Sequence, residues 1–515
     1  MSPEKDYRRK IKTREELRTI LGARPRAKTV IMCHGTFDIV HPGHVRHLMY
    51  CRDKADLLVA SLTSDEHIAK GNLRPYVPQD LRAMNLAALE SVDYVIIDHN
   101  ATPLENLRLL QPDFFAKGYE YVHGSVHPKT REEMDILESY GGEMIFTPGD
   151  VVYSSSAIVD MVPPRIAHDK LALLMKAEGV TFADLRAAMK SFAGRRVHVV
   201  GDTIVDTYSY CTVIGGGTKT PTLSVRHDHT VSYSGGAAVV AKHLRKAGAN
   251  VDFSSVLGND ALRDFVLKDL KSEGIRCHEI VDSTRPTTQK NLFIAASHRL
   301  LKLDHVDNRN IADRIVTKLT EQVASIECDA IVFSDFHHGL FNVSSIPTLI
   351  GAIPKGPIKV ADSQVASRWG NILDFKGFDL ITPNEREARF ALGDQDSVVR
   401  PMALNLFTKV DCKYLILKLG ERGIITYRRG GGDQDPRQFF TIDSFVENLV
   451  DPVGAGDALL AYSTLALSTT RSEVVASILG SMAAAVACET DGNNPVSPEQ
   501  VSRIIDVVEK RSDYT

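Results

Sequence analysis

The 515-residue sequence predicts an α/β protein built from two domains in series, and three observations support this prediction. Between residues 28 and 162, short apolar runs typical of buried strands alternate with helical stretches. Two adjacent prolines, Pro163 and Pro164, then interrupt regular structure. A second alternation begins at Arg196. We therefore expect an N-terminal helical extension, a first α/β domain, a helical linker and a larger second α/β domain, at residues 1–27, 28–163, 164–194 and 195–515.

The first domain is expected to open with a strand in VIMCHGTFD, a helix in HPGHVRHLMY and a second strand in DLLVASLT. Parallel strands need a crossover connection, and a helix usually provides it. Further strands are expected in DYVIID, DFFAKG and MIFTPG. Helices should separate them, over Asp80–Leu89, near Pro103–Leu110 and over Thr130–Tyr140.

The second domain follows a helical segment over Asp169–Phe192 and begins with RVHVVGDTIVD. Two β-rich stretches, TPTLSVRHDHTVSYSGG and TTQKNLFIAASHRLLKLD, alternate apolar and polar residues as strands exposed on one face do. Buried strands are expected in AIVFSDF, IKVADS, DLITPNE, YLILKLG and GIITYR. The last expected helices are Gly456–Leu467 and Val474–Cys488.

Composition excludes several classes of function. The 61 basic and 65 acidic side chains give a net charge of −4, so no charge excess is available to hold nucleic acid or an anionic membrane. The seven cysteines are scattered without metal-site spacing and read as reduced thiols of a cytoplasmic protein. The N-terminus is charged, unlike a signal peptide, and apolar runs such as ALLAYSTLAL are too short to span a bilayer.

A first candidate site lies in His41-Pro42-Gly43-His44, where a strand is expected to turn into a helix. The histidines are three residues apart, so both can face one way from the first helical turn. Gly43 leaves room for a phosphate near a helix N-terminus, which favours negative charge. Two imidazoles there can stabilise charge building on a phosphorus atom under attack. The alternative is a pair of surface histidines at a helix start.

The surrounding segment GTFDIVHPGHVRHL resembles the nucleotidyltransferase superfamily that includes cytidylyltransferases and sugar-phosphate adenylyltransferases. KGNLRP, PQDLR, KGYEY and YSSSAI follow in that family's order, and KGYEY is similar to the heptose-phosphate branch. The resemblance implies a Rossmann-like fold in which a sugar 1-phosphate attacks the α-phosphorus of a nucleoside triphosphate. It makes His41 and His44 catalytic. It also implies that the nucleotide and phosphates are bound by Gly35, Thr36, Phe37, Lys70, Arg82, Lys117, Ser154, Ser155 and Ser156.

A second candidate site lies in Asp451-Pro-Val-Gly-Ala-Gly-Asp457, directly before an apolar helical stretch. Small residues at a helix N-terminus present backbone N–H groups to an anion such as a transferring phosphate. Asp457 can take the proton from an attacking hydroxyl, as phosphoryl transfer requires. The alternative is a glycine turn with an aspartate cap.

DPVGAGDALLA resembles the C-terminal signature of the ribokinase-like, or PfkB, carbohydrate kinases, and GDTIVD, SGGAAVVAKHLRKAGA, TPNEREA and LKLGERG match other segments of that family. The resemblance implies a ribokinase-like fold with a β-sheet lid formed by the two β-rich stretches. It makes Asp457 the catalytic base. The expected nucleotide and phosphate contacts are Asn384, Glu387, Gly420, Gly423, Gly454, Ala455 and Gly456. The expected sugar contacts are Asp202, Asp206, Gly235, Gly236, Lys290 and His338.

Three departures from the kinase pattern affect the expected substrate. Val239 stands where family members usually have an asparagine that contacts the sugar, and His338 stands where heptose kinases carry a lysine. Pro452 and Val453 replace small or hydroxylated residues before the glycine motif. The first two positions lie on the substrate side, while the motif for phosphoryl transfer is intact.

Together the halves resemble the bifunctional bacterial enzymes that phosphorylate heptose 7-phosphate at O1 and adenylylate heptose 1-phosphate, with the domain order reversed. The resemblance implies ATP as substrate and Mg²⁺ bound through phosphates, with Glu387 as the candidate protein ligand. It also implies a homo-oligomer, expected to be a dimer, that acts on small phosphorylated sugars. Two alternatives stay open. One is another sugar or polyol phosphate with CTP as nucleotidyl donor, and the other is a kinase-like domain that only binds ligand or dimerises.

Overall fold

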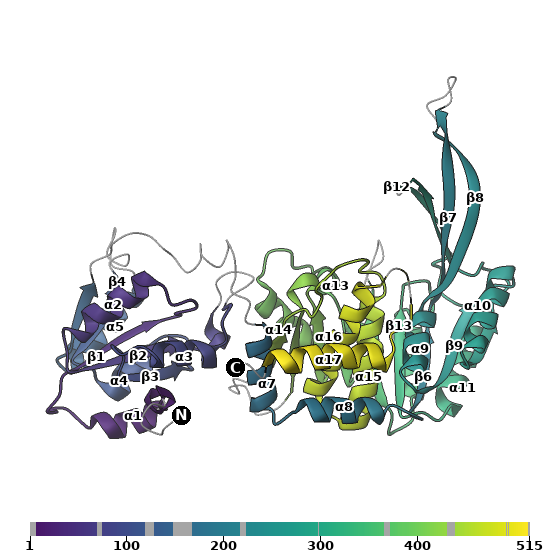
Figure 1. The fold of residues 1–515 in the computed structure, drawn as a ribbon. Coiled ribbons are helices and arrows are strands. Elements are labelled where there is room, and N and C mark those ends of the chain that lie inside the picture. Colours follow the sequence, from purple (N-terminus) through teal and green to yellow (C-terminus); the bar gives the residue numbers. More distant parts are fainter. Residues whose placement is uncertain are drawn as a thin grey trace. The chain divides into compact units, whose positions relative to one another are not determined.

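The computed structural model divides the chain into two compact units, residues 1–166 and 167–515 (Figure 1). Each unit has its own hydrophobic core. The structure describes residues 7–68, 75–118, 128–147, 167–216, 223–296, 298–364, 371–429, 438–490, 492 and 494–512.

The first unit is a five-stranded parallel sheet with the order β3-β2-β1-β4-β5. The chain adds β2 and β3 on one side of β1 and then places β4 and β5 on the other side. The order of the strands therefore reverses between β1 and β4, and in open α/β sheets ligands bind at such a switch point. In chain order the elements are η2 (Tyr7–Lys10), α1 (Arg14–Leu21), β1 (Val30–Gly35), α2 (Pro42–Arg52), β2 (Leu57–Thr63), η3 (Asp65–His67), α3 (Gln79–Ala87), β3 (Tyr94–Asp98), α4 (Leu104–Leu110), β4 (Phe114–Gly118), α5 (Pro128–Ser139) and β5 (Glu143–Thr147).

Both faces of this sheet are buried. Successive residues of β1 point to opposite faces, so Ile31 packs into one hydrophobic cluster and Met32 into the other. Helix α1 begins at a capping box in which Thr13 and Glu16 satisfy each other's backbone N–H groups. Its Leu17 is completely buried in the second cluster, so the N-terminal extension is part of this unit.

The second unit contains a nine-stranded sheet with the order β10-β9-β6-β13-β14-β15-β16-β17-β18. Its strands are parallel from β10 to β16, and β17 and β18 are antiparallel. The strand order reverses between β6 and β13, which makes a second switch point. The elements of this sheet and its helices are α7 (Ala167–Ala177), α8 (Phe182–Lys190), β6 (Arg196–Gly201), α9 (Ala237–Lys246), β9 (Asn250–Leu257), α10 (Ala261–Ser272), β10 (Arg276–Val281), α11 (Asp313–Ser325), β13 (Ala330–Asp335), α12 (Ser345–Ala352), β14 (Ile358–Ser363), η5 (Ile372–Asp374), β15 (Leu380–Ile381), α13 (Glu385–Leu392), α14 (Val399–Val410), β16 (Tyr414–Lys418), η6 (Gly420–Arg422), β17 (Ile424–Arg428), β18 (Phe439–Ile442), α15 (Ala455–Thr470), α16 (Glu473–Cys488) and α17 (Pro498–Ser512).

A separate four-stranded sheet, ordered β12-β11-β7-β8, rises from the edge of this unit (Figure 1). Its strands β7 and β8 are each 14 residues long, and β8 is buried only at its base. The sheet matches the expected lid. Its strands are β7 (Thr203–Gly216), β8 (Leu223–Gly236), β11 (Gln289–Ala295) and β12 (His298–His305).

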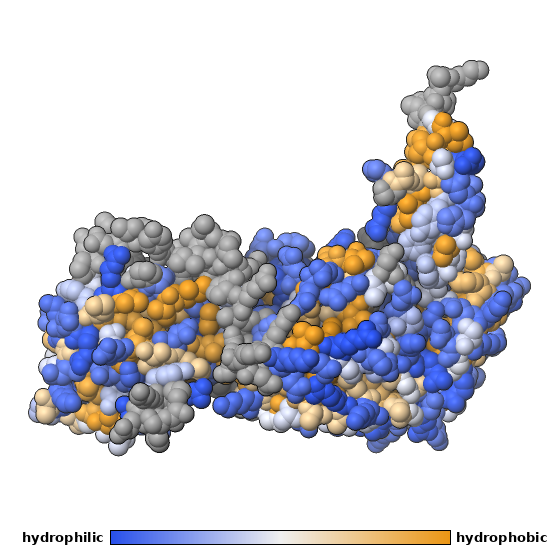
Figure 2. All heavy atoms as spheres, viewed as in Figure 1, coloured by the Kyte–Doolittle hydropathy of each residue, from blue (hydrophilic) through white to orange (hydrophobic). Residues whose placement is uncertain are grey.

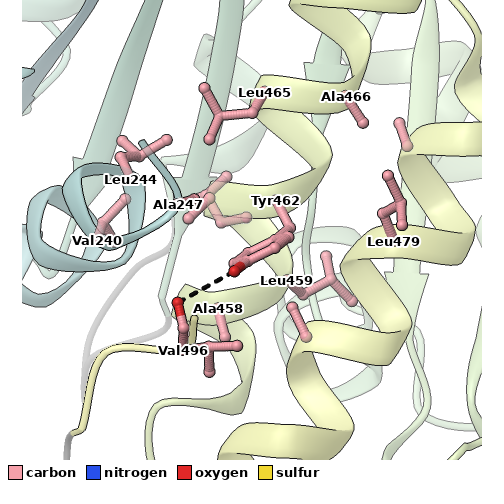
Figure 3. Packing of buried hydrophobic residues seen from close by; sticks show 14 of the residues in the cluster. Val240, Leu244, Ala247, Ala458, Leu459, Tyr462, Leu465, Ala466, Leu479 and Val496 are labelled. Carbon is pink, nitrogen blue, oxygen red and sulfur yellow. Dashed lines mark hydrogen bonds between the residues drawn. The ribbon is translucent and has the colours of Figure 1, made fainter. Parts of the chain in front are cut away.

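Helices α15 and α16 are apolar along almost their whole length because they pack in the middle of the second unit. Figure 3 shows Tyr462 of α15 among leucine and alanine side chains of α9, α15 and α16. Its hydroxyl donates a hydrogen bond of 3.1 Å to the carbonyl of Val496. This packing fixes the position of α15, whose N-terminus carries the second candidate site.

The expected linker forms helices α7 and α8, and both pack into the core of the second unit. Leu171 and Leu185 belong to the same hydrophobic cluster as Tyr462. Glu178, just after α7, forms a two-pronged ion pair with Arg428 at 2.8 and 2.9 Å. Residues 167–194 are therefore structural members of that unit. The predicted α/β fold class is confirmed for both halves. Among the described helices, none is long and apolar enough to cross a bilayer.

Candidate active sites

The first site lies at the switch point of the first unit. Strand β1 ends at Gly35, and the following turn leads to His41, which caps α2. Strand β4 ends beside it with Lys117 and Gly118. The structure therefore brings the histidine motif and Lys117 to the same edge of the sheet, where the carboxyl ends of parallel strands meet.

The two histidines of the motif stack on each other, with ring centroids 4.0 Å apart. His41 Nδ1 accepts a 3.1 Å hydrogen bond from the Gly43 N–H, so the proton of the neutral ring is on Nε2. His44 Nδ1 lies 3.1 Å from the Ile39 carbonyl oxygen and must donate to it, which leaves Nε2 as the lone-pair nitrogen. Neutral histidines thus offer one donor and one acceptor, and protonation of His44 would make both Nε2 atoms donors.

Burial lowers the pKa of both rings. The pKa of His41 lies below its usual value because of desolvation, and desolvation together with the neighbouring His41 lowers that of His44 to about 4. Both rings are neutral at pH 7 without a bound anion. A polyphosphate would reverse this effect by favouring the imidazolium form.

Steric constraints fix the turn before α2. Phe37 has a positive φ of 47°, and its ring makes an edge contact with His44. A Cβ on Gly35 would lie 3.2 Å from the Phe37 ring, and one on Gly43 only 2.9 Å from His41 Cε1. A larger residue at either position would therefore crowd an aromatic ring, so both positions require glycine. Thr36 lies between them, with its carbonyl facing the interior.

Arg82 occupies a different place from the one its predicted role requires. Its side chain is completely buried, and its guanidinium donates to the Thr36 carbonyl, to the Thr63 carbonyl at 3.0 Å and to Asp65 Oδ1 at 2.6 Å. These contacts brace the turn that carries Thr36 and Phe37. In this conformation Arg82 is a positioning residue, because protein oxygens accept from both of its terminal nitrogens and no face of the side chain reaches solvent.

Lys117 is half-buried at the end of β4. It forms an ion pair with Glu133 and donates a 3.2 Å hydrogen bond to Thr130 Oγ1. Both partners lie on α5, so this helix sets the lysine's position. The predicted phosphate contacts Lys70, Ser154, Ser155 and Ser156 lie outside the described residues.

Sequence reasoning missed a buried network next to this site. His34 of β1 lies 3.0 Å from Ser61 Oγ, 3.2 Å from Thr63 Oγ1 and 3.7 Å from Asp98 Oδ2. Burial lowers the pKa of His34 to about 4 and raises that of Asp98. The four residues come from the carboxyl ends of three neighbouring strands. Only the parallel register brings them together, and no sequence spacing indicates it.

The second site lies along the carboxyl edge of the larger sheet. Strands β6, β13, β14, β15 and β16 are neighbours in this sheet, and each has a polar residue within three positions of its carboxyl end. These residues are Asp202, Asp335, Asp362, Asn384 and Lys418.

Asp202 lies at the centre of the part of this site that the resemblance assigns to the sugar. Its Oδ2 accepts hydrogen bonds from the N–H groups of Phe336 at 2.9 Å and His338 at 3.2 Å. Burial raises the pKa of Asp202 and that of Asp335, and the neighbouring Asp202 further disfavours the charged form of Asp335. The SDFHHG segment therefore holds the sugar-side aspartate through its backbone.

Two predicted glycines are required by the lid. A Cβ on Gly235 would lie 2.0 Å from Asp206 Oδ2, and one on Gly236, which has a φ of 61°, would lie 2.5 Å from the Asp202 carbonyl. Lys290 of β11 interacts electrostatically with Asp206, and burial lowers its pKa. The structure thus brings the predicted sugar-side residues Asp202, Asp206 and Lys290 to the base of the lid.

The structure describes both residues, His338 and Val239, that depart from the kinase pattern on the predicted substrate side. His338 is partly buried, and desolvation together with Lys290 lowers its pKa to about 3, so the ring is neutral. Its Nδ1 has no hydrogen-bond partner among the described residues. Val239 in α9 is completely buried. At the position where the resemblance leads us to expect a lysine, this chain therefore has a neutral imidazole ring.

The phosphate side lies at the N-terminus of α15. Gly454 caps the helix in the left-handed conformation with a φ of 82°, and no side chain caps it. Ala455 and Gly456 follow, so their backbone faces the site without bulky side chains. Asp457 stands in the first turn, and burial together with Asp362 raises its pKa to about 8.

A charged cluster that sequence reasoning missed lies beside this helix N-terminus. Lys418 Nζ donates to Asp362 Oδ1 at 2.9 Å, and a Cβ on Gly456 would lie 3.2 Å from that nitrogen. Burial would lower the pKa of Lys418, but Asp362 and Glu387 outweigh it and raise the pKa. The lysine therefore carries its charge at the mouth of the phosphate site.

The predicted Asn384–Glu387 pair forms a capping box at the start of α13. The Asn384 N–H and side-chain amide donate to the Glu387 carboxylate at 2.7 and 2.6 Å, and Asn384 Oδ1 accepts from the Glu387 N–H. Burial raises the pKa of Glu387. Gly420 and Gly423 flank η6 with positive φ values, and a Cβ on Gly423 would lie 2.0 Å from the Ile442 carbonyl.

The described residues contain no group of three or more histidine, cysteine or carboxylate side chains arranged to hold a metal ion. Glu387, Asp362 and Asp457 interact electrostatically and supply hard oxygen atoms. Mg²⁺ binds mainly through phosphate oxygens with one or two carboxylates, so one or two of these side chains would suit it once nucleotide phosphates are bound.

Comparison with protein families agrees with this geometry. Residues 32–160 match the cytidylyltransferase-like family, and residues 195–500 match the pfkB family of carbohydrate kinases. The matches confirm the predicted kinds of domain and their order, with the nucleotidyltransferase-like half first.

Two relatives of this chain are both named Bifunctional protein HldE. The one from Syntrophotalea carbinolica is 43% identical over 142 residues, which is 27% of this chain and 28% of the relative. The one from Desulfatibacillum aliphaticivorans is 27% identical over 318 residues, which is 60% of this chain and 63% of the relative. Each match thus spans less than two thirds of the relative's length.

Among solved structures, phosphofructokinase-2 from Escherichia coli in complex with potassium matches with a TM-score of 0.52. The identity is 18%, and the match covers 61% of this chain and 99% of that one, which shows the shared fold alone. The family match covers more than half of the sequence and coincides with the sheet, lid and helix terminus described above. The chain therefore belongs to the pfkB family of carbohydrate kinases and carries a cytidylyltransferase-like unit ahead of its kinase unit.

Proposed function

We propose that this chain is a bifunctional enzyme of nucleotide-sugar synthesis. Its second unit transfers the γ-phosphoryl group of ATP to a sugar phosphate, and its first unit transfers a nucleotidyl group to a sugar 1-phosphate with release of pyrophosphate. The observation that carries the proposal is that each sheet has its candidate phosphate-binding residues at the carboxyl ends of its parallel strands, beside a helix N-terminus.

In the first unit, a sugar 1-phosphate oxygen attacks the α-phosphorus and pyrophosphate leaves. His41 donates from Nε2 to a phosphoryl oxygen. His44 gains a proton as the polyphosphate binds and then donates as well, which stabilises the negative charge of the transition state. Lys117 neutralises an anionic substrate, and Arg82 holds the Thr36 turn in place.

In the second unit, a sugar hydroxyl attacks the γ-phosphorus at the N-terminus of α15. Asp457 takes the hydroxyl proton, because its raised pKa makes it a competent base near neutral pH. The backbone N–H groups around Gly456 hold the transferring phosphoryl group. Asp202, Asp206 and Lys290 orient the sugar at the base of the lid.

Mg²⁺ is expected to be held by the phosphate oxygens, with Glu387 as the candidate protein ligand that the family resemblance implies. When bound, it neutralises charge on the β- and γ-phosphates. For the sugar, we propose heptose 7-phosphate, phosphorylated at O1, and heptose 1-phosphate as nucleotidyl acceptor, with AMP transferred from ATP. The similarity of KGYEY to the heptose-phosphate branch and the bifunctional relatives support this choice.

The proposal is tested by parallel turnover assays on the purified full chain with Mg²⁺. Pyrophosphate release is followed with ATP or CTP and a panel of sugar 1-phosphates, and ADP formation is followed with heptose 7-phosphate and other phosphosugars. We expect ATP and the heptose substrates to react fastest. Preferred turnover of CTP with another sugar or polyol phosphate would replace the substrate assignment, and absence of kinase turnover on every sugar would leave a binding or dimerising unit.

Variants connect each activity to its site. His41→Ala and His44→Ala should each lower pyrophosphate release by about 10²-fold and leave ADP formation unchanged, because one charge contact in the transition state is lost. Asp457→Asn should lower ADP formation and leave pyrophosphate release unchanged. If all three variants retain both activities, the site assignments are wrong.

We also propose that the chain forms a homodimer through its lid. Figure 2 shows hydrophobic residues gathered on the upper part of the projecting sheet. Exposed side chains there include Tyr210, Val213, Ile214, Leu223, Leu301 and Leu303. Such an exposed apolar area on a soluble sheet marks an interaction surface. Light scattering should give a dimer mass for the wild type and a monomer mass for Ile214→Asp/Leu301→Asp. A monomeric wild type would contradict the proposal.

A further inference from the structure

Lys418 is a buried cation in the segment LKLGERG, where the sequence predicts a role only for Gly420 and Gly423. It is the last residue of β16, and its side chain is only 15% exposed. A lysine ammonium has three N–H donors. The structure gives it one acceptor, Asp362 Oδ1 at 2.9 Å. Two donors of a nearly buried ammonium are therefore left over, which is costly unless a ligand accepts them.

The position of this ammonium is fixed at the anion-binding helix terminus. A Cβ on Gly456 would lie 3.2 Å from Lys418 Nζ, so the nitrogen is in contact distance of the first turn of α15. The backbone on both sides of Lys418 is held by neighbours. Its own N–H donates to the Pro383 carbonyl at 2.8 Å, and it forms an isolated parallel bridge with Asn384.

The charge balance of the site requires a cation at this place. Asp362, Glu387 and Asp457 all interact electrostatically with Lys418. A nucleoside triphosphate would bring several more negative charges to the same point, and uncompensated carboxylates would repel it. Lys418 is the cation that the described part of the chain places inside this cluster.

We propose that Lys418 is a catalytic residue of the kinase unit that binds the transferring phosphoryl group directly. It keeps its ion pair with Asp362 and donates its remaining N–H groups to phosphoryl oxygens. This inference rests on the kinase activity proposed above and assigns it a further residue.

The step that Lys418 assists is balanced without any further reactant. The sugar oxygen forms a bond to the γ-phosphorus, its proton moves to Asp457, and the bond to the oxygen bridging the β- and γ-phosphorus atoms breaks to release ADP. Lys418 stays protonated throughout and stabilises charge on the transferring group. Its role is electrostatic, like that of the helix N-terminus, and it does not exchange a proton.

The test compares Lys418→Met with Lys413→Met in the full chain. Lys413 lies just before the opposite end of the same strand and also pairs with an aspartate, Asp379, at 2.5 Å. We expect Lys418→Met to lower kcat for ADP formation by about 10²-fold with a smaller change in KM for ATP, because the lost contact is strongest in the transition state. Lys413→Met should retain wild-type kinetics.

A binding measurement separates this role from a structural one. ADP alone should bind Lys418→Met within about threefold of wild type, while ADP with aluminium fluoride, a mimic of the transferring phosphoryl group, should bind roughly 10²-fold more weakly. Lys418→Met/Asp362→Asn removes the unpaired buried carboxylate. It should recover the thermal stability that Lys418→Met loses, and it should keep the weak binding of the aluminium fluoride complex.

Each outcome decides one question. Lys418→Met with kcat and aluminium fluoride affinity within threefold of wild type would overturn the inference and leave the kinase activity standing. Lack of kinase turnover in the wild type would overturn the proposed function itself. Pyrophosphate release by the first unit of the same chain measures the amount of active chain and should be unchanged in every variant, while thermal unfolding reports whether the second unit is folded.

Discussion

The stacked histidine pair predicts that Gly43→Ala inactivates nucleotidyl transfer without harming the fold. The added methyl group would lie 2.9 Å from His41 Cε1 and 3.0 Å from Nδ1. Carbon atoms in contact normally stay about 3.5 to 4.0 Å apart, so the imidazole must move by roughly 0.5 to 1 Å. That movement breaks the 3.1 Å hydrogen bond from the Gly43 N–H and the stack on His44.

The expected loss follows from this displacement. Misplacing a catalytic group by about 1 Å costs on the order of 10²-fold in rate. The stability of the unit should change little, because the gain of about 0.5 to 1 kcal/mol from Gly→Ala inside a helix offsets the loss of the His41 cap and of its stack on His44. Pyrophosphate release should therefore drop by about 10²-fold while the thermal transition stays in place.

The assay needs one control and one double variant. Gly351→Ala, in helix α12, meets no atom within 4 Å and should leave both activities unchanged. His41→Ala/Gly43→Ala should be no slower than His41→Ala, since both changes act through the same ring. Full activity of Gly43→Ala, or additive losses in the double variant, would refute the geometry of the pair.

Further predictions concern the second unit. Asp457→Asn should lower ADP formation by roughly 10²- to 10⁴-fold, the usual contribution of a general base, and leave pyrophosphate release intact. Because the folded-state pKa of Asp457 is raised to about 8, its contribution to stability is full below its ordinary pKa near 4 and is lost as the pH rises through 8. The transition temperature of Asp457→Asn should accordingly rise relative to that of wild type between pH 5 and pH 9. A difference between the two proteins that is the same at pH 5 and pH 9 would contradict this. Gly235→Ala, whose methyl would meet Asp206 Oδ2 at 2.0 Å, should raise KM for the sugar more than KM for ATP in steady-state kinetics. Tyr462→Phe should cost the second unit about 1 kcal/mol in denaturant unfolding, because the Val496 carbonyl loses its buried donor; no change would show that the bond is unimportant.

Local patterns in the sequence predicted the strands, the two motifs and the kinds of domain. Val30–Gly35 and Ala330–Asp335 form strands because apolar β-branched runs are buried on both faces of a parallel sheet. The glycine motif stands at the start of a helix, as predicted, and Gly454 there adopts the left-handed conformation. These features depend on residues close together in the chain.

Contacts between distant segments could not be predicted in this way. Lys418 meets Asp362 across 56 residues, and only the order β14-β15-β16 brings them together. Arg82 looked like a phosphate ligand by motif, but its burial directs the guanidinium to backbone carbonyls. The helical pattern of residues 167–194 predicted helices and gave no sign that Leu171 and Leu185 join the kinase core.

The central claim is that one chain holds two separate phosphorus chemistries, and ³¹P NMR tests it most directly. With ATP, Mg²⁺ and heptose 7-phosphate, the wild-type chain should give ADP and a sugar bisphosphate. With ATP, Mg²⁺ and heptose 1-phosphate, it should give pyrophosphate and a nucleotide sugar. Asp457→Asn should abolish only the formation of ADP and the sugar bisphosphate. Absence of both product pairs for these and for the other sugar phosphates tried would contradict the account.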